Sequence, residues 1–578
     1  MKLAYKKNYL IIFGSAILAG MIMTGCNKKL DQFSQTAITD NIFWKDSGQL
    51  IMATNYLYTS LPDFNSALDE LMSDFAVDIR TTTVNAISEG SRTAPANDAQ
   101  WSNPYAFIRA AHNIMEKSAA IPDGPMKTYC IAQARFFRAL AYFNLVKAYG
   151  DVPYLSRTIT GREDETLYTP RTDRRIVVDS IYADLDFAAT VCPQPDQLPG
   201  TTTTTGTAGR EYGRITRSAA LALKSRIALY EGSWEKFHGE PELSGPKDPN
   251  KHFRIAKEAA QLIITENKHS LYTADGPLSF QNLFRYPGET YAKNKENILA
   301  RLYGKSITEN VASNAYLRTA NTDGGNAATR ALVTTALYTD GLPAGKSPLD
   351  SNGKETGLLT DYQNRDPRLI QTLFKPGDPY ASIAGGNPVY GNTYYYHQQK
   401  YFTGQTDFIN SASFLDFIVI RYAEVLLNYA EATYELNGSI SDQDLDLSIN
   451  LLRKRATNND NSKLSLLTNS FVSVNGLNMR EEIRRERAIE LAYEGHRYWD
   501  LIRWKTAEIE LPKAILERKY FNDVNYGGST KPPLLNGYVL FEAADKRKFD
   551  VAKDYLWPIP TAQIGLSKGT LTQNPGWN

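Results

Sequence analysis

Three glutamates on one predicted helix are the residues best suited to do chemistry in this 578-residue chain. Glu486, Glu490 and Glu494 stand four residues apart, so on a helix they form a single ridge. Two carboxylates that flank a glycosidic bond can hydrolyse it, one as acid and the other as base or nucleophile. Such carboxyl groups face each other across a cleft, about 5 to 9.5 Å apart, whereas these three share one helix.

The same stretch is rich in arginine, which favours ion pairing over catalysis. Arg487 and Arg497 lie within one turn of the glutamates, and Asp500 follows three residues later. Tyr498 and Trp504 add apolar surface, so these charges cannot all lie on a solvated face. The preferred interpretation is a partly buried ion network that orients the helix, made by Glu486, Arg487, Glu490, Glu494, Arg497 and Asp500. Hydrolysis of a glycan by Glu490 and Glu494 is the alternative.

The helix that carries these charges is predicted over 479–505, where every third or fourth side chain is apolar. The same spacing predicts helices over 101–117, 130–149, 177–189, 216–234, 253–264, 418–437 and 445–456. Gly150 and Gly438 supply stop signals. Such helices pack as antiparallel pairs, although the tetratricopeptide consensus of about 34 residues is not legible. The predicted fold class is mainly α, with a tetratricopeptide-like (TPR-like) helix-pair scaffold.

Between 271 and 416 the helical spacing fades, and Asn, Gly, Thr, Pro and Tyr dominate. The segments 281–286, 296–303 and 390–402 alternate in polarity, as short strands do. Long irregular segments on a rigid scaffold commonly carry binding residues. We therefore expect ligand contacts in a large loop-rich region with few short strands.

The N-terminus has the three parts of a lipoprotein signal. A basic segment, 2–7, precedes an apolar segment, 10–23, that is too short to span a bilayer comfortably, and Gly25-Cys26 follows. This arrangement resembles a bacterial lipobox, which implies cleavage after Gly25 and acylation of Cys26. Two or three acyl chains on one residue give a stable membrane anchor. An ordinary secretory peptide with a chance cysteine is the alternative.

Composition excludes several classes of partner. The chain carries 64 basic and 63 acidic side chains, with no basic block interleaved with aromatics, so nucleic acid is excluded as a ligand. Cys130 and Cys192 form no CxxC motif, and the six histidines have no metal-ligand spacing. We therefore expect a buried free thiol at Cys130, no metal site and no cofactor. The 35 tyrosines suit interfaces and sugar-stacking sites, although most must pack between helices.

Short segments in family order resemble the SusD/RagB family of outer-membrane nutrient-binding lipoproteins. Two of them are RYAEVLLNYAEA at 421–432 and EGHRYWDLIRW at 494–504. With the lipobox, the segments span nearly the whole mature chain, at 134–143, 149–153, 420–432, 452–456, 484–487, 494–504, 556–560 and 573–576.

The resemblance implies a TPR-like scaffold without catalysis that captures a glycan outside the cell. It implies a partnership with a TonB-dependent transporter of the SusC type and anchorage in the outer membrane. Asn27 gives no signal for inner-membrane retention, and surface exposure rests on the resemblance alone. Some relatives bind peptides, so a peptide- or protein-nutrient ligand is the alternative. The implied regions are a signal peptide (1–25), an N-terminal SusD-like region (26–270), the loop-rich ligand-binding region (271–416) and a C-terminal region with an extended tail (417–578).

The shared segments do not name the ligand, so candidate binding residues follow from chemistry alone. A sugar ring stacks on Tyr or Trp, while Asn, Asp and Arg bond its hydroxyls. By these types the candidates are Asp78, Arg80, Trp101, Tyr286, Tyr291, Tyr316, Arg318, Asn321, Tyr394 and Tyr396. Each has a structural alternative: Trp101 opens a helix and is equally suited to the core. Strand alternation would place Tyr394 and Tyr396 on one face.

Overall fold

The computed structural model describes residues 43–80, 84–161, 163–198, 213–239, 242, 245–289, 294–304, 325–380, 390–410, 413–526 and 530–577. The predicted lipidation site Cys26 and the binding candidates Tyr291, Tyr316, Arg318 and Asn321 lie outside these residues.

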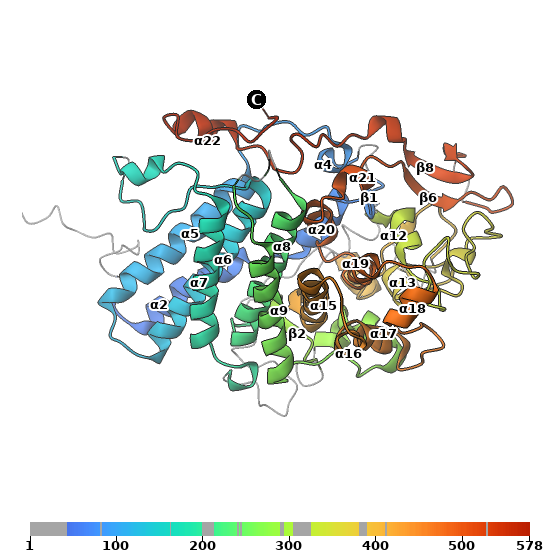
Figure 1. The fold of residues 1–578 in the computed structure, drawn as a ribbon, viewed down its shortest axis with the longest axis horizontal. Helices are drawn as coiled ribbons and strands as arrows, with labels where there is room; N and C mark the ends of the chain where they lie inside the picture. Colours follow the sequence, from blue (N-terminus) through green and yellow to red (C-terminus); the bar gives the residue numbers. More distant parts are fainter. Residues whose placement is uncertain are drawn as a thin grey trace, which may run out of the picture.

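Antiparallel helices form a row that runs through the molecule (Figure 1). Neighbours along the chain pack side by side from α5 to α9, and α15 then packs against α9 and α19. This arrangement confirms the predicted mainly α, TPR-like scaffold. Its members are α2 (Ser47–Leu57), α5 (Ala99–Lys117), α6 (Pro125–Tyr149), α7 (Arg174–Val191), α8 (Arg217–Phe237), α9 (Pro249–Glu266), α15 (Tyr422–Asn437) and α19 (Met479–Glu490).

Local capping explains where these helices begin and end. The Asp98 side chain accepts a hydrogen bond from Gln100 N at the start of α5, and Thr216 accepts one from Ala219 N at the start of α8. Gly150 follows α6 and Gly438 follows α15, both with positive φ, as the sequence predicted.

The stretch 479–505 is two helices and not one, so that prediction was wrong. α19 ends at Glu490, and α20 (Arg497–Arg503) begins after a turn in which Tyr493 and Gly495 have φ of 61° and 78°. The turn passes close to an earlier part of the chain, because a Cβ on Gly495 would lie 2.4 Å from the carbonyl oxygen of Ser66. Only glycine fits this position, and the apolar spacing on either side does not reveal the break.

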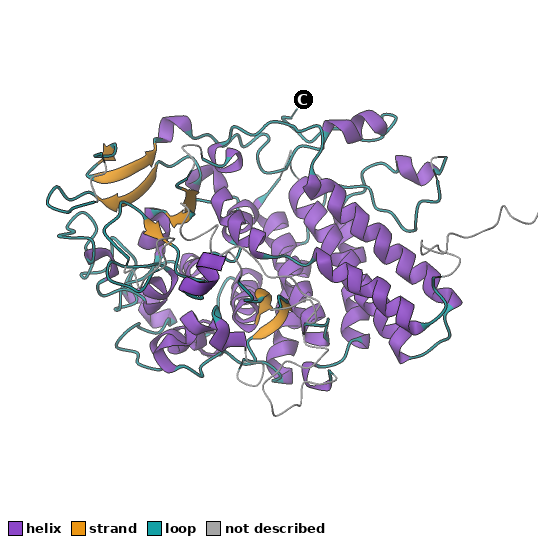
Figure 2. Ribbon diagram, turned by 180° about the vertical axis from the view of Figure 1, so that it is seen from behind, coloured by secondary structure: helices purple, strands orange, loops and turns teal. Residues whose placement is uncertain are grey.

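In the described part of the chain, three small antiparallel sheets lie outside the helical row (Figure 2). In the first, Asp78 pairs with Asn326, and Ala328 pairs with both Ala76 and Tyr396. The strands are β1 (Ala76–Asp78), β3 (Asn326–Ala328) and β4 (Tyr396–His397); β2 (Asn297–Arg301) and β5 (Phe417–Arg421); and β6 (Ile515–Lys519), β8 (Tyr538–Glu542) and β7 (Leu534–Leu535).

The loop-rich region is only partly stranded. Strands occur within 296–303 and 390–402, but 281–286 begins in a short helix, α10 (Ser279–Leu283), because Phe280, Leu283 and Phe284 bury one helical face. The other short helices are α3 (Phe64–Leu68), α4 (Ala86–Glu89), α12 (Arg330–Thr335), α13 (Pro367–Thr372), α14 (Gln405–Asn410), α16 (Asp442–Leu447), α17 (Ile449–Thr457), α18 (Asn469–Val474), α21 (Ala507–Glu510) and α22 (Thr561–Leu566).

The C-terminal tail returns to the N-terminal helices. Trp557 N donates to Ala148 O at 2.7 Å, and Asn574 Nδ2 donates to Tyr149 O at 3.0 Å, so the tail closes over the end of α6. Cys130 and Cys192 are buried free thiols, which confirms the prediction for Cys130. Within the described ranges, none of the helices combines the length and apolar character needed to cross a bilayer.

Candidate functional site

Glu490 lies at the centre of a buried ion network. Its carboxylate is 2.7 Å from Arg421 and 2.9 Å from Arg368, and Arg455 is a third partner. Glu296 lies 2.9 Å from Arg421 and 3.2 Å from Arg455. These cations come from the end of β5, from α13 and from α17, so the network joins three elements to α19.

The other two glutamates of the ridge are also paired. Glu486 is 2.6 Å from Arg368 and 2.9 Å from Arg453. Glu494 is 2.6 Å from Lys400 and 2.7 Å from Arg421. These partners come from other segments of the chain. The spacing of the three glutamates had instead suggested that they pair with arginines on their own helix.

The electrostatics of Glu490 and Glu494 do not suit acid–base catalysis. Burial alone would raise the pKa of Glu490, but the charges of Arg455, Arg421 and Arg368 hold it well below its usual value. Arg421 and Lys400 likewise outweigh burial and lower the pKa of Glu494. A glycosidase needs one carboxyl group with a raised pKa to protonate the leaving group. Both of these groups are ionised and paired, so they do not form such a couple.

The flanking charges hold α19 and α20 together and tie them to the N-terminal half. Arg487 Nε lies 2.8 Å from Asp500, which connects the two helices across the turn. Arg497 forms a bidentate pair with Asp74, at 2.8 and 2.9 Å. The six charged residues singled out in the sequence therefore have structural partners.

A related buried group predicts how stability depends on pH. Glu431 accepts hydrogen bonds from Arg503 at 2.5 and 2.7 Å and from Trp504 Nε1 at 2.6 Å. Burial would raise the pKa of Glu431, but Arg503 outweighs it and lowers the pKa from 4.5 to about 2. A carboxyl group whose folded-state pKa is depressed stabilises the fold above its unfolded pKa, and this contribution is lost as pH falls.

We therefore expect the Tm of the wild-type protein to fall between pH 4.5 and about pH 2, partly through Glu431. Glu431→Gln should have a lower Tm at pH 7 and a weaker loss of Tm over the same interval. Thermal unfolding followed by circular dichroism at several pH values measures both. If the Tm of the wild type and the Tm of Glu431→Gln change in parallel with pH, Glu431 does not contribute to the pH dependence of stability.

Two binding candidates lie at the end of β1. Arg80 forms a bidentate pair with Asp78, at 3.0 and 2.8 Å, and a third of the Arg80 side chain is exposed. Asn326, opposite Asp78 across the ladder, is 2% exposed. The candidates Tyr316, Arg318 and Asn321 precede β3 in the sequence but lie outside the described residues.

Three other candidates are held in structural contacts. Trp101 is 4% exposed, and its ring centroid lies 5.0 Å from that of Tyr149, edge to face. The Tyr286 hydroxyl donates to Asp407 and accepts from Phe414 N. Tyr396 is fully buried and donates to Asp361 at 2.7 Å, so it has no ring face to offer a ligand.

Tyr394 belongs to a cluster of half-buried aromatics, the tyrosine patch, formed by Tyr394, Tyr520 and Tyr526. The ring centroids of Tyr394 and Tyr526 lie 4.4 Å apart, and Tyr520 and Tyr526 stack at 5.4 Å. β4 begins at Tyr396, so strand alternation does not reach Tyr394, and the two rings do not share a face. Sequence reasoning missed Tyr520 and Tyr526, which follow β6 in a polar stretch of the chain that gives no sign of an aromatic cluster.

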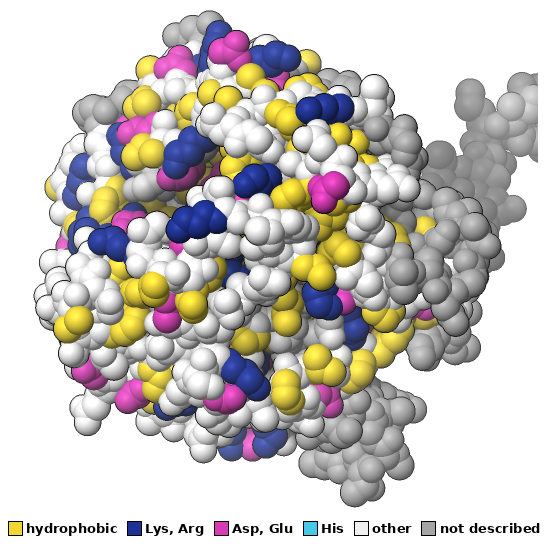
Figure 3. All heavy atoms as spheres, turned by 90° about the vertical axis from the view of Figure 1, so that its right-hand side faces the viewer, with side chains coloured by type: hydrophobic (Ala, Val, Ile, Leu, Met, Phe, Trp, Pro, Cys, Tyr) yellow, Lys and Arg dark blue, Asp and Glu magenta, His cyan; other side chains and the backbone are white. Residues whose placement is uncertain are grey.

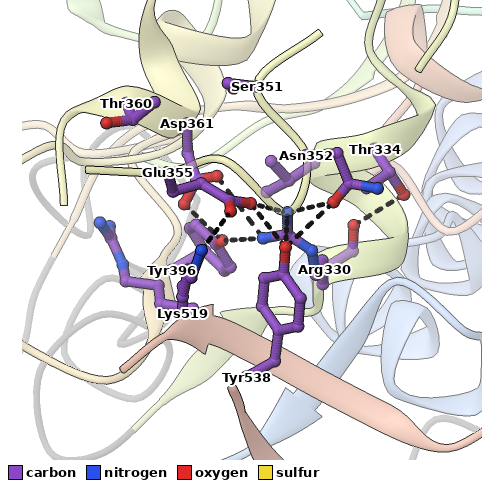
Figure 4. Close-up of polar contacts among 12 residues, drawn as sticks. Arg330, Thr334, Ser351, Asn352, Glu355, Thr360, Asp361, Tyr396, Lys519 and Tyr538 are labelled. Carbon is purple, nitrogen blue, oxygen red and sulfur yellow. Dashed lines mark hydrogen bonds and ion pairs between the residues drawn. The ribbon is translucent and has the colours of Figure 1, made fainter. Parts of the chain in front are cut away.

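A polar cavity of about 530 Å³ lies between α12, α19 and the β6–β8 strands. Arg330 holds one wall in place (Figure 4). Its guanidinium pairs with Glu355 and donates to Asn352, to Tyr538 Oη at 3.1 Å and to Tyr396 Oη at 3.2 Å. The described residues contain no group of three or more His, Cys, Asp or Glu placed to hold a metal ion. The polar and charged side chains that line the cavity suit a polar or charged ligand.

Comparisons with known proteins agree with this architecture. The chain is 25% identical to the SusD-like protein P2 of Formosa agariphila, over 99% of this chain and 100% of that protein. A solved SusD-like carbohydrate binding protein of Bacteroides fragilis is 25% identical, with a TM-score of 0.70 over 91% of this chain and 99% of that chain. A second SusD-like protein of the same species is 22% identical, with a TM-score of 0.71 over 93% of this chain and 98% of that chain.

Two family profiles cover most of the sequence. One, described as "Starch-binding associating with outer membrane", matches residues 26–229. The other, described as "SusD family", matches residues 289–577, which is half of the chain. With the fold and the relatives in agreement, the chain belongs to the SusD family.

Proposed function

We propose that this protein is a lipid-anchored, surface-exposed lipoprotein of the outer membrane that captures a glycan and delivers it to a TonB-dependent transporter of the SusC type. Binding takes place without catalysis. The family description supports an association with the outer membrane and with starch binding. The similar Bacteroides fragilis protein is described as carbohydrate binding, which supports a glycan as the ligand.

The observation that carries the glycan proposal is the tyrosine patch. Its three rings are partly exposed and lie within 4.4 to 6.2 Å of one another, so they present adjoining aromatic surface. Sugar rings stack on such surfaces through their C–H faces. Asn392 and Asn525 lie beside the patch, where Asn392 Nδ2 donates to Asn525 O at 3.3 Å. Polar groups of this kind bond sugar hydroxyls.

The Asp78–Arg80 pair is separate from the patch: through Ala328, Tyr396 is level with Ala76, so Tyr394 precedes this level and Asp78 follows it. Ile79, between these two residues, packs against a small cluster formed by Val77, Ala327 and Ile515, and so does Tyr395. The pair offers charged groups that bond sugar hydroxyls and is a second candidate contact, apart from the patch.

Peptide binding by strand addition is less well supported. This mode needs an open sheet edge long enough to pair with an extended peptide. The outer strands of the β1–β3–β4 sheet have three and two residues, which offer few backbone groups.

Affinity electrophoresis tests the glycan proposal. The chain beginning at Asn27 would be run through gels that contain plant, host or microbial polysaccharides, and we expect retardation by at least one of them. The double variant Tyr520→Ala/Tyr526→Ala should weaken binding by about fivefold to about 140-fold, since two aromatic contacts at about 0.5–1.5 kcal/mol each sum to about 1–3 kcal/mol and about 1.4 kcal/mol is tenfold.

Tyr56→Ala is the matched control, because Tyr56 is 53% exposed on α2, at the opposite end of the molecule from β6 and β8 (Figure 1). It should bind like the wild type. If no polysaccharide retards the protein, the glycan proposal is contradicted. If Tyr56→Ala loses as much affinity as the double variant, the assignment of the site to the tyrosine patch is contradicted.

Two further experiments test the lipid anchor and the transporter partnership. Labelling with radioactive palmitate should occur in the wild type and be lost in Cys26→Ala. Co-purification of the protein with the SusC-type transporter tests the partnership.

A further inference from the structure

The polar cavity has an excess of positive charge on its walls. Six cationic side chains line it but only three anionic ones, Asp74, Glu481 and Glu510. The cations are Arg330, Arg484, Arg485, Arg497, Lys513 and Arg547. On the face shown in Figure 3, basic, acidic and apolar side chains are interspersed among the described residues. The excess in the cavity is therefore a local feature and not part of a broad basic surface there.

Most of these cations have close carboxylate partners. Arg497 pairs with Asp74 at 2.8 Å, and Lys513 pairs with Glu510 at 2.6 Å. Arg547 pairs with Glu542 at 2.9 Å. The corresponding charges are compensated within the protein.

Arg484 is the exception. It is 8% exposed, and its Nε and Nη2 groups have no hydrogen-bond partner. Its ion pair is with Glu481, at 3.6 Å from Nη1, and that side chain is 58% exposed. Leaving a buried donor unsatisfied costs about 1–3 kcal/mol, and more when the group is charged. Burial also lowers the pKa of Arg484, which agrees with incomplete compensation of its charge.

Arg484 lines the cavity, and packing against aromatic rings holds its guanidinium in place. It lies over the rings of Trp504, at 4.7 Å, and Phe237, at 5.1 Å. Trp504 lines the cavity as well. Guanidinium groups bind carboxylate and sulfate oxygens through paired N–H donors, and they do so best when held in place. Neutral polar groups from Thr334, Asn352 and Tyr538 also line the cavity and suit sugar hydroxyls.

We propose that this cavity, which we call the Arg484 cavity, binds an acidic saccharide, with the carboxylate or sulfate of the sugar on Arg484. The volume of about 530 Å³ is larger than a simple inorganic ion needs and falls in the usual range for small-molecule sites. The inference deepens the proposed glycan-binding function and rests on it, but it concerns a site separate from the tyrosine patch. A glycan ligand would then carry uronic acid or sulfated residues.

Isothermal titration calorimetry of the purified protein with D-glucuronate, D-glucose 6-sulfate, D-glucose and inorganic sulfate tests this assignment. We expect one or both acidic sugars to bind at least tenfold more tightly than glucose and inorganic sulfate. The two acidic sugars distinguish a carboxylate from a sulfate as the recognised group. Binding of neither acidic sugar, or equal binding of glucose or inorganic sulfate, would overturn the proposal.

Variants locate the site. Arg484→Met should weaken binding of the acidic sugar at least tenfold. Arg480→Met is the control, since Arg480 lies one turn earlier on α19 and pairs with Glu435 at 2.7 Å, away from the cavity; it should keep the wild-type affinity. If Arg484→Met does not fold, Lys513→Met serves instead, because this rim residue has a 60% exposed side chain, and we expect a two- to fivefold loss. Unchanged affinity in the variant tested would overturn the proposal.

The tyrosine variants separate this inference from the proposed function. Tyr520→Ala/Tyr526→Ala should lose retardation by polysaccharide but keep the affinity for the acidic monosaccharide. A wild-type protein that is retarded by a polysaccharide but binds no acidic sugar would refute the Arg484 cavity alone. A wild-type protein that does neither would refute both.

Discussion

Glu490→Ala is expected to lower the free energy of unfolding by about 3–5 kcal/mol, the usual cost of removing one partner from a buried ion pair. The reason lies in what the substitution leaves behind. Arg368, Arg421 and Arg455 are each about 1% exposed and all contact the Glu490 carboxylate. Without it they are held together by Glu296, Glu486, Glu494 and Asp366, with one negative charge fewer in the interior.

Urea unfolding followed by circular dichroism measures the loss as a shift of the midpoint. Glu481→Ala is the control, because Glu481 is on the same helix but 58% exposed, with one ion pair at 3.6 Å. An exposed pair of this kind contributes about 0–1 kcal/mol, so the control should unfold close to the wild type. A shift in Glu490→Ala no larger than in the control would show that the network adds little stability.

Gly495→Ala has the second largest expected effect, a loss of at least about 2 kcal/mol. The residue has φ of 78°, where an L side chain costs about 1–2 kcal/mol. In addition, the new Cβ would meet the carbonyl oxygen of Ser66 at 2.4 Å, and this atom belongs to backbone that cannot rotate away. The turn between α19 and α20 would have to move off α3, which disturbs the nearby ion pairs.

Gly438→Ala isolates the contribution of the close contact. Gly438 also has positive φ, 72°, but a Cβ there would meet no atom within 4 Å. The free energy of unfolding of Gly438→Ala should therefore fall only by the cost of an L residue at positive φ, about 1–2 kcal/mol. Equal losses in the two variants, measured by urea unfolding, would mean that the chain near Ser66 adapts without cost.

The helical scaffold could be predicted from sequence because its signals are local. Thr216 caps α8 and Gly438 ends α15 through contacts with residues a few positions away. The break at Gly495 could not be predicted, since it depends on Ser66, more than four hundred residues earlier in the chain. Likewise, the ridge glutamates suggested ion pairs, but their partners Arg368 and Arg421 come from distant segments.

The candidate site was harder to predict, because residue type does not determine exposure. Tyr394 and Tyr396 are two positions apart, yet Tyr396 is fully buried and Tyr394 joins a partly exposed patch. The difference arises because Tyr396 pairs with Ala328, so its ring faces the core. Tyr520 and Tyr526 join Tyr394 only through the fold. Arg484 resembles its neighbours in sequence, and only its unsatisfied donors distinguish it.

The closure of the tail over α6 has a consequence for the order in which this chain can fold. Asn574 bonds to Tyr149 across 425 residues, and Trp557 bonds to the neighbouring Ala148. Contacts of such long range form late, because the intervening loop must close first. The end of α6 therefore stays uncovered until residues 557–574 have been made and have folded back. The packing of the α6 end is therefore completed only after residues more than four hundred positions apart have met.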